Sequence, residues 1–223
     1  STLFPYTTLF RSPDDFYRAY DENCDNYVIT LSSKLSGVYN SAMVAKEMFE
    51  EEHEGVRIHV FDSRSAAAAQ HLLYEKIVEL ADSGCSFEEV VEAAEAFRDE
   101  MFTIFVLDDL ETFKKNGRLK GIKALVATTM NVKPVLIGDD GDIKQIDQAI
   151  GMNRAVNRLL WHIEKKNLDP SRKVRITQCA SRELCAKIAA VLTERFGFTD
   201  VKIINAGGIS TTYENPGGVV IAL

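Results

Sequence analysis

Hydrophobic and polar residues alternate in blocks along the first half of the chain, in a way that predicts strands and helices in turn. Short apolar runs predict buried strands, and these are "YVITL" (27–31), "VRIHVFD" (56–62) and "MFTIFVL" (101–107). A helical pattern follows the first run as far as about Glu51, and another covers 65–82. Ser86 and Glu89 have the spacing of a capping box, which begins a third helix. Strands that alternate with helices predict right-handed crossovers and a parallel sheet covered on both faces.

The second half has a different pattern, which predicts a mixed sheet. The segments "VKPVLIG" (132–138) and "DIKQIDQAI" (142–150) flank "DDGD", which predicts a hairpin with Asp-Gly in the turn. Calcium binding by this loop is an alternative, although the alternating ligand spacing of an EF-hand is absent. Further segments complete the pattern, with helices at 153–166 and 182–196 and strands at 173–180, 201–207 and 218–223. The predicted fold class is α/β with two domains, a parallel doubly wound domain (13–118) and a mixed-sheet domain (119–223), joined near Asn116 to Lys120.

The first twelve residues, "STLFPYTTLFRS" (1–12), resemble the translated end of a sequencing adapter. We interpret residues 1–12 as an artefact and exclude them from the fold, as for a fusion scar; the alternative is a natural aromatic-rich arm. The native sequence then begins near Pro13, where proline and two acidic residues predict a helix over 13–23. We therefore expect the natural N-terminus to be missing and the first domain to be incomplete.

Composition narrows the function classes. Of the 223 residues, 46% are hydrophobic and 26% are charged, which is ordinary for a soluble globular protein. The formal charge of −7 argues against a nucleic-acid-binding protein with a broad basic face. No apolar run approaches the roughly 18 residues of a membrane span. The four cysteines lack CxxC spacing, which favours reduced residues of a cytoplasmic protein and no metal site; we expect no cofactor either.

The stretch "LSSKLSGVYNSA" (31–42) is the clearest candidate for chemistry, because hydroxyls and a glycine stand between a predicted strand and a predicted helix. A helix N-terminus attracts anions, Gly37 allows close approach to the backbone, and Ser36 adds a hydroxyl donor. A serine that only caps the helix is the structural alternative. Ser36 could also be the nucleophile of a hydrolase, although none of the four histidines lies in an activating motif. A binding module for a small phosphorylated metabolite remains the third possibility.

Several motifs together resemble those of the DegV family, whose members usually have S-S-x-L-S-G-T-Y-x-S-A at the position of "LSSKLSGVYNSA". Four other segments match that family in the same order, and these are "SPDDFYRAYD", "VFDSRSAAAAQ", "LETFKKNGRL" and "NVKPVLIGDDGDI". The resemblance implies a protein that binds a long-chain fatty acid between two α/β domains, with the carboxylate at Leu35-Ser36-Gly37. It also implies a carrier rather than an enzyme. Some members of the family carry the acyl chain for a fatty acid kinase and present the carboxylate to a separate ATP-binding subunit, which makes such a subunit a candidate partner here.

The resemblance also suggests further residues and shows where this chain departs from the family. The candidates for the same crevice are Ser33, Ser63, Tyr213 and Arg118 in "NGRL". Ser63 could instead cap a helix, and Arg118 could instead stabilise the interdomain connection. Tyr213 stands where many members have a histidine, and a phenol stays neutral below a pKa of about 10. Thr8 occupies the place of a family threonine, but it lies in the adapter-like segment.

Two further departures concern the kinase partner and the N-terminus. Family members that act as kinase partners tend to have an arginine before the helix that begins here near Met152, where this chain has Ile and Met. Members ordinarily begin with a further strand before the point that matches Pro13. We expect the chain as written to be less stable, and to bind fatty acid more weakly, than one that carries that strand, because a strand without its neighbour leaves backbone groups unpaired.

Overall fold

The computed structural model describes residues 12–118 and 131–223. Its elements in chain order are α1 (Pro13–Tyr17), β1 (Asn26–Thr30), α2 (Val38–Glu52), β2 (Ile58–Asp62), α3 (Ala68–Asp82), α4 (Phe87–Glu100), β3 (Thr103–Val106), α5 (Glu111–Lys115), β4 (Val132–Asp139), β5 (Asp142–Ile150), α6 (Met152–Lys166), β6 (Lys173–Gln178), α7 (Arg182–Glu194), β7 (Asp200–Asn205), α8 (Gly208–Glu214) and β8 (Val219–Ala222). The interpretation of residues 1–11 as adapter sequence lies outside the described residues. The predicted domain junction falls partly outside them too, and the division at residue 118 stays a prediction.

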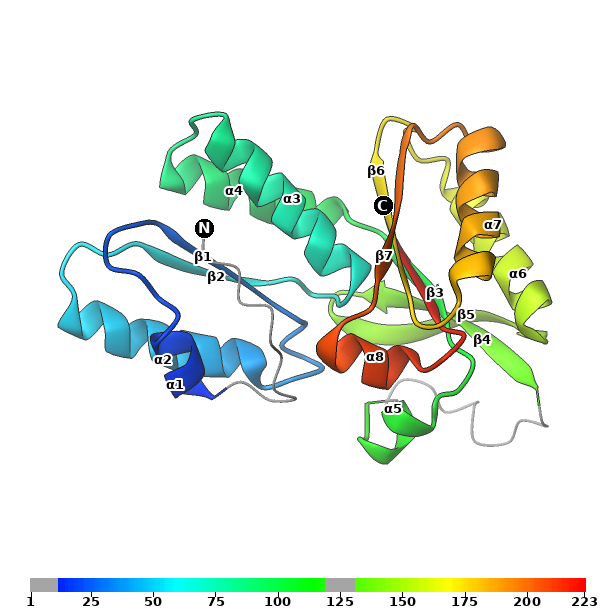
Figure 1. Cartoon of the computed structure of the whole chain (residues 1–223), viewed down its shortest axis with the longest axis horizontal. Coiled ribbons are helices and arrows are strands. Elements are labelled where there is room, and N and C mark those ends of the chain that lie inside the picture. The colour runs from blue at the N-terminus through cyan, green and yellow to red at the C-terminus, as the bar shows by residue number, and fades with distance from the viewer. Residues whose placement is uncertain (1–11, 119–130) are drawn as a thin grey trace.

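β1 and β2 form a two-stranded parallel sheet, as the pattern of the first half predicts. Figure 1 shows α1 and α2 on one face of this sheet and α3 and α4 on the other. Successive residues of β2 point to opposite faces: Val60 packs in one cluster with Phe49 of α2, whereas Phe61 packs in another with Leu73 of α3. A parallel sheet covered on both faces is therefore confirmed.

The second sheet has six strands in the order β5-β4-β3-β8-β6-β7. β6 and β7 are parallel, and the remaining pairs are antiparallel, so the predicted mixed sheet is confirmed. One expectation is wrong: the run at 101–107 contributes β3 to this sheet, between β4 and β8, and not to the parallel sheet. All four residues of β3 are buried. A short run of buried apolar residues predicts a strand covered on both faces, but it does not specify the neighbours or their direction.

The hairpin between β4 and β5 packs its turn against the first sheet. Asp140 and Gly141 both have positive φ, 48° and 85°, as a two-residue hairpin turn of this kind requires. The buried Ser32 hydroxyl donates to the Gly141 carbonyl oxygen at 2.7 Å, and a Cβ at Gly141 would lie 2.7 Å from the same hydroxyl. Of the acidic side chains considered as calcium ligands, those of Asp140 and Asp142 lie 3.0 and 3.5 Å from the Lys34 ammonium. The turn therefore joins the two sheets through a hydrogen bond and ion pairs.

Helix α3 is shared by the two sheets. Leu73 and Ile77 pack beside Phe61 of the first sheet, whereas Ala68 and Leu72 belong to a cluster with strands of the second. On the opposite face of the second sheet, α6 and α7 cover the largest apolar cluster (Figure 1). The small residues that begin α3 let the helix lie close to the second sheet, so α3 holds the two halves together.

The first helix is shorter than predicted, because it ends at Tyr17 and not near residue 23. Asp21 and Asn23 form hydrogen bonds between side chains and nearby backbone groups, and such bonds compete with helix continuation. Ser12, which we grouped with the adapter-like residues, begins α1 in a capping box with Asp15.

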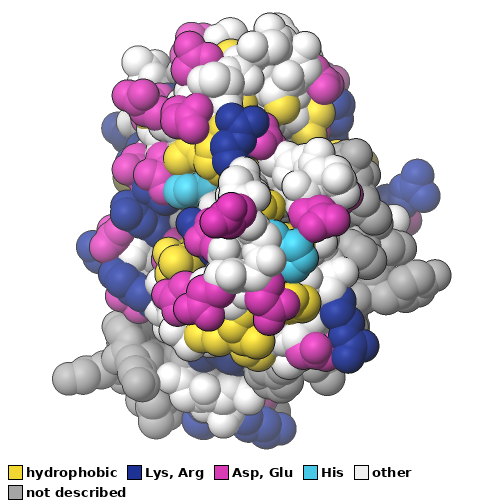
Figure 2. Space-filling view, turned by 90° about the vertical axis from the view of Figure 1, so that its left-hand side faces the viewer, with side chains coloured by type: hydrophobic (Ala, Val, Ile, Leu, Met, Phe, Trp, Pro, Cys, Tyr) yellow, Lys and Arg dark blue, Asp and Glu magenta, His cyan; other side chains and the backbone are white. Residues whose placement is uncertain are grey.

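The distribution of acidic and basic side chains on the surface is consistent with the formal net charge of −7. On the face in Figure 2, acidic side chains are interspersed with basic ones, without a broad basic surface among the described residues there. Within the described ranges, no helix combines the length and the apolar character that crossing a lipid bilayer requires.

Candidate functional site

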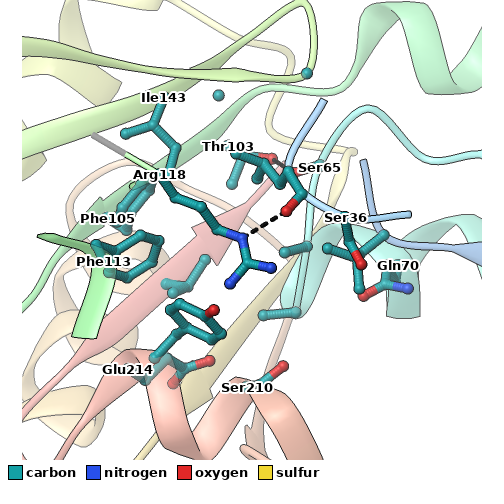
Figure 3. Close-up of a pocket in the computed structure, with 18 of the residues that line it drawn as sticks. Ser36, Ser65, Gln70, Thr103, Phe105, Phe113, Arg118, Ile143, Ser210 and Glu214 are labelled. Carbon is teal, nitrogen blue, oxygen red and sulfur yellow. Dashed lines mark hydrogen bonds between the residues drawn. The ribbon is translucent and has the colours of Figure 1, made fainter. Parts of the chain in front are cut away.

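A cavity lies between the two sheets and has a volume of about 840 Å³, which includes the part open to solvent. Its wall comes from the loop after β1, the beginning of α3, strands β3 and β8, helices α5 and α8, and the β4–β5 hairpin. Figure 3 shows the side chains that line it.

Much of the wall is apolar. Phe105 of β3, Leu107 just beyond it and Val220 of β8 are almost completely buried and line the cavity. Phe113 of α5 and Ile143 of β5 add partly buried apolar surface. A ligand in this space would therefore bury hydrocarbon more readily than polar groups.

Ser36 lies in the cavity wall immediately before α2, as the sequence predicts for a strand-to-helix junction. The backbone N–H groups of Leu35 and Ser36 donate to the Ser32 carbonyl, which forms a tight loop after β1. The Ser36 hydroxyl accepts from the Val38 N–H at 3.3 Å, so its own proton is available to a ligand. Gly37 is the N-cap with φ of −74°, which any residue adopts; it is outside the wall, with open space where a Cβ would be.

Arg118 brings a positive charge beside Ser36. Its Nε donates to the Leu35 carbonyl oxygen, and its guanidinium lies 5.0 Å from the centre of the Tyr213 ring. The Tyr213 ring contacts Phe113 edge-on at 4.8 Å between centroids. Within 12–118 and 131–223, no carboxylate forms an ion pair with Arg118. From the sequence, Arg118 is a candidate for the pocket or for the interdomain connection. In the structure its side chain lies in the cavity wall (Figure 3).

Ser33 and Ser63 lie outside this wall. The Ser33 N–H donates to Asp62 Oδ1 at 3.1 Å, and its hydroxyl donates to the other oxygen of the same carboxylate. The Ser63 hydroxyl donates to the Ser65 carbonyl at 3.0 Å, and Ser63 lines a neighbouring polar pocket that shares part of its wall with the cavity. The structure thus brings Ser36, Arg118 and Tyr213 together around one cavity and gives the other two serines hydrogen bonds within the fold.

Glu214 is a cavity residue that the sequence reasoning missed. It ends α8, which was not predicted, and only 3% of it is exposed. The Thr177 hydroxyl donates to Oε1 at 3.1 Å, and Oε2 has no hydrogen-bond partner among the described residues. Burial raises the pKa of Glu214 to about 7, against a smaller lowering by the hydrogen bond from Thr177. The "NPGG" segment was the available signal: a Cβ at Gly218 would lie 2.2 Å from the Glu214 carbonyl oxygen, so only glycine allows this close packing.

No histidine is in a position to activate Ser36. The side chains of all four histidines contact carboxylates elsewhere, in the pairs His53–Glu22, His59–Glu95, His71–Glu75 and His162–Asp147. A serine nucleophile needs a base within about 2.6–3.2 Å of its hydroxyl. The site has the features of a binding cavity, with an apolar wall, a hydroxyl and a guanidinium.

Comparison with known proteins agrees with this architecture. A DegV domain-containing protein of Streptococcus pneumoniae is 33% identical over 211 residues, which are 94% of this chain and 75% of that protein. The structure resembles a DegV family protein from Ruminococcus gnavus, refined with vaccenic acid, with a TM-score of 0.91 and 36% identity over 96% of this chain and 77% of that one. It also resembles the S. pneumoniae Fatty Acid Kinase (Fak) B3 protein loaded with linoleic acid, with a TM-score of 0.88 and 32% identity over 95% of this chain and 75% of that one.

The family model that matches is described as an uncharacterised protein of the DegV family, and it matches residues 4–223. The match covers nearly the whole chain, including the Ser36 loop, α3 and both sheets. The chain therefore belongs to the DegV family.

Proposed function

We propose that this protein binds one long-chain fatty acid in the cavity between its two sheets, with the carboxylate at Ser36 and Arg118. The observation that carries the proposal is the pairing of a hydroxyl and a guanidinium without an ion-pair partner in the described residues, next to an apolar wall. The fatty acids in the R. gnavus and S. pneumoniae neighbours support the same class of ligand. Among the alternatives, a hydrolase would need a base at Ser36, and no basic group in the described part of the chain forms a hydrogen bond with its hydroxyl. A phosphorylated metabolite would leave the apolar wall without a partner.

The expected energies separate the roles of tail and head group. Burial of an acyl chain contributes up to about 0.8 kcal/mol per CH₂, and hydrogen bonds to a charged head group contribute roughly 1.5–3 kcal/mol. The tail therefore sets most of the affinity, whereas Ser36 and Arg118 set the orientation. A tyrosine phenol carries no positive charge in either protonation state, so Arg118 provides the positive charge on that side of the cavity.

We further propose that the protein is a carrier without catalytic activity of its own and without a cofactor. The bound carboxylate would be presented to a separate ATP-binding fatty acid kinase subunit, a role supported by the likeness to the Fak B3 protein. We propose a cytoplasmic location, which the free thiols of all four cysteines support.

The first prediction is that the purified protein carries a long-chain fatty acid. Because the tail contributes most of the affinity, we expect the ligand to survive gentle purification. Mass spectrometry of an organic extract of the folded protein measures this directly. An extract that contains only polar phosphates, or no ligand at all, would overturn the proposal.

The second prediction concerns the head-group contacts. Ser36→Ala is expected to raise the dissociation constant for vaccenic acid by about tenfold, because it removes a hydrogen bond to a charged group. Arg118→Leu should weaken binding at least as much, because it removes the nearby positive charge. Ser171→Ala, on the exposed loop before β6, serves as the matched control and should leave the affinity unchanged. Titration calorimetry gives all four constants; equal affinity in the Ser36→Ala and unmodified proteins would assign Ser36 a structural role alone.

A further inference from the structure

The cavity has a second polar position that the proposed head-group site does not use. Glu214 and Ser210 both line the cavity from α8. In Figure 3 they lie below the Arg118 guanidinium, whereas Ser36 and Gln70 lie to its right. If the carboxylate of a fatty acid lies at Ser36, α8 would lie beside its hydrocarbon tail and not beside its head group.

One carboxyl oxygen of Glu214 has no hydrogen-bond partner among the described residues. Its Oε1 is engaged by the Thr177 hydroxyl, while Oε2 has no partner within the described residues, although the side chain is almost completely buried. No lysine, arginine or histidine in the described part of the chain forms an ion pair with it. Buried polar atoms in folded proteins nearly always have a hydrogen-bond partner. Glu214 lines the cavity, so a bound ligand is one source of the missing partner.

The chemistry of Glu214 limits what that partner is. A plain hydrocarbon chain cannot donate a hydrogen bond, so it would leave Oε2 without a partner. A second carboxylate on the ligand would meet the like charge of Glu214 whenever that group is ionised. A hydroxyl can donate to a carboxyl oxygen in either protonation state of the glutamate. The hydroxyl of Ser210, on the same helix, offers a further hydrogen-bonding group beside it.

We propose that Glu214 is a specificity-determining residue that selects fatty acids bearing a hydroxyl on the chain, which donates to Oε2 while the carboxylate lies at Ser36 and Arg118. This inference rests on the proposed function, because it needs a fatty acid in the cavity. The contacts of the carboxylate with Ser36 and Arg118 do not require a hydroxyl on the acyl chain, whereas the proposed contact with Glu214 does.

The test compares stearic acid with a series of monohydroxystearic acids that differ in the position of the hydroxyl. The unmodified protein should bind at least one member about tenfold more tightly than stearic acid, the effect of one hydrogen bond to a buried carboxyl. Glu214→Leu should bring that ratio close to one, because leucine fills similar space without an acceptor. Glu183→Leu, which replaces an exposed glutamate on α7 outside the cavity, should keep the ratio of the unmodified protein.

The outcomes separate the two proposals. If stearic acid binds and no hydroxylated member binds more tightly, the role of Glu214 is overturned while the fatty acid function stands. If neither kind binds, both proposals are overturned. A crystal structure with the best hydroxylated ligand keeps the test decisive even if Glu214→Leu does not fold, since a hydroxyl beyond hydrogen-bond distance of Glu214 would contradict the assignment.

Discussion

Replacing Arg175 with alanine is expected to destabilise the protein by about 3–5 kcal/mol, because it removes the buried guanidinium that pairs with both Glu75 and Asp200. Arg175 of β6 has no exposed surface. Its Nε donates to one Glu75 oxygen at 2.9 Å and its Nη2 to the other, while Nη1 donates to Asp200 Oδ1 at 2.9 Å. The guanidinium thus joins α3 to β6 and β7, at the place where α3 holds the two sheets together.

Urea unfolding measures this effect against a matched control. Arg195→Ala removes an arginine whose ion pair with Glu164 is largely exposed, so a loss below about 1 kcal/mol is expected. Changing Glu75 and Asp200 to Gln and Asn together with Arg175→Met should recover part of the lost stability, because no unpaired charge remains. A loss for Arg175→Ala as small as that of the control would show that the network contributes little.

The same network should make the protein sensitive to acid. The hydrogen bond from Arg175 lowers the pKa of Asp200. Burial alone would raise the pKa of Glu75, but the hydrogen bond and charge of Arg175 together outweigh it, so that pKa is lowered too. Carboxyls with depressed folded-state pKa values stabilise the fold above their unfolded values of about 4, and this contribution is lost as pH falls through the folded values. Arg175→Ala should accordingly show a weaker pH dependence of unfolding free energy in this acid range.

Glu214→Gln is expected to change the unfolding free energy of the ligand-free protein by different amounts at pH 8 and pH 4.5. At pH 8 the change should be more stabilising than at pH 4.5 by up to about 3 kcal/mol. The folded-state pKa of about 7 lies above the unfolded value of 4.5. The folded protein therefore keeps a proton that the unfolded chain releases, and stability falls as pH rises from 4.5 to 7, then levels off. Glutamine has no charge to bury, so the variant escapes this penalty.

The measurement is the unfolding free energy of ligand-free protein, by urea titration at several pH values between 4.5 and 8.5. Glu183→Gln, at an exposed position on α7, should follow the unmodified protein throughout. Any general packing effect of glutamine at position 214 is the same at every pH, so only the change with pH bears on the prediction. A constant difference between the Glu214→Gln and unmodified proteins would contradict it.

Most strands and long helices could be predicted because each has a short-range signal. Alternating blocks of apolar and polar residues predicted β1, β2, α2 and α3, and the Ser86 capping box marked the beginning of α4. The expectation for β3 was wrong because its place in a sheet depends on distant segments and not on a short-range signal. Its partners, β4 and β8, are distant in the sequence, and four consecutive buried residues fit either sheet equally well.

The candidate site divides in the same way. Ser36 could be predicted because a hydroxyl and a glycine between a strand and a helix form a local pattern, and the family motif includes it. Arg118 and Tyr213 were candidates by resemblance alone, and their contact with each other depends on the approach of α5 and α8. Glu214 was missed because an isolated glutamate usually lies on the surface, and its burial follows from the packing of α8 against Thr177 of β6.

The sequence by itself determined the α/β class, the order of the main elements, the Asp140–Gly141 turn and the position of Ser36, since each depends on residues within a few positions of one another. Only the tertiary structure decided that β3 joins the second sheet, that α3 serves both sheets, and that Ser36, Arg118 and Glu214 line one cavity. The physical reason is that strand pairing and burial are settled by contacts between segments far apart in the chain, which no local pattern specifies.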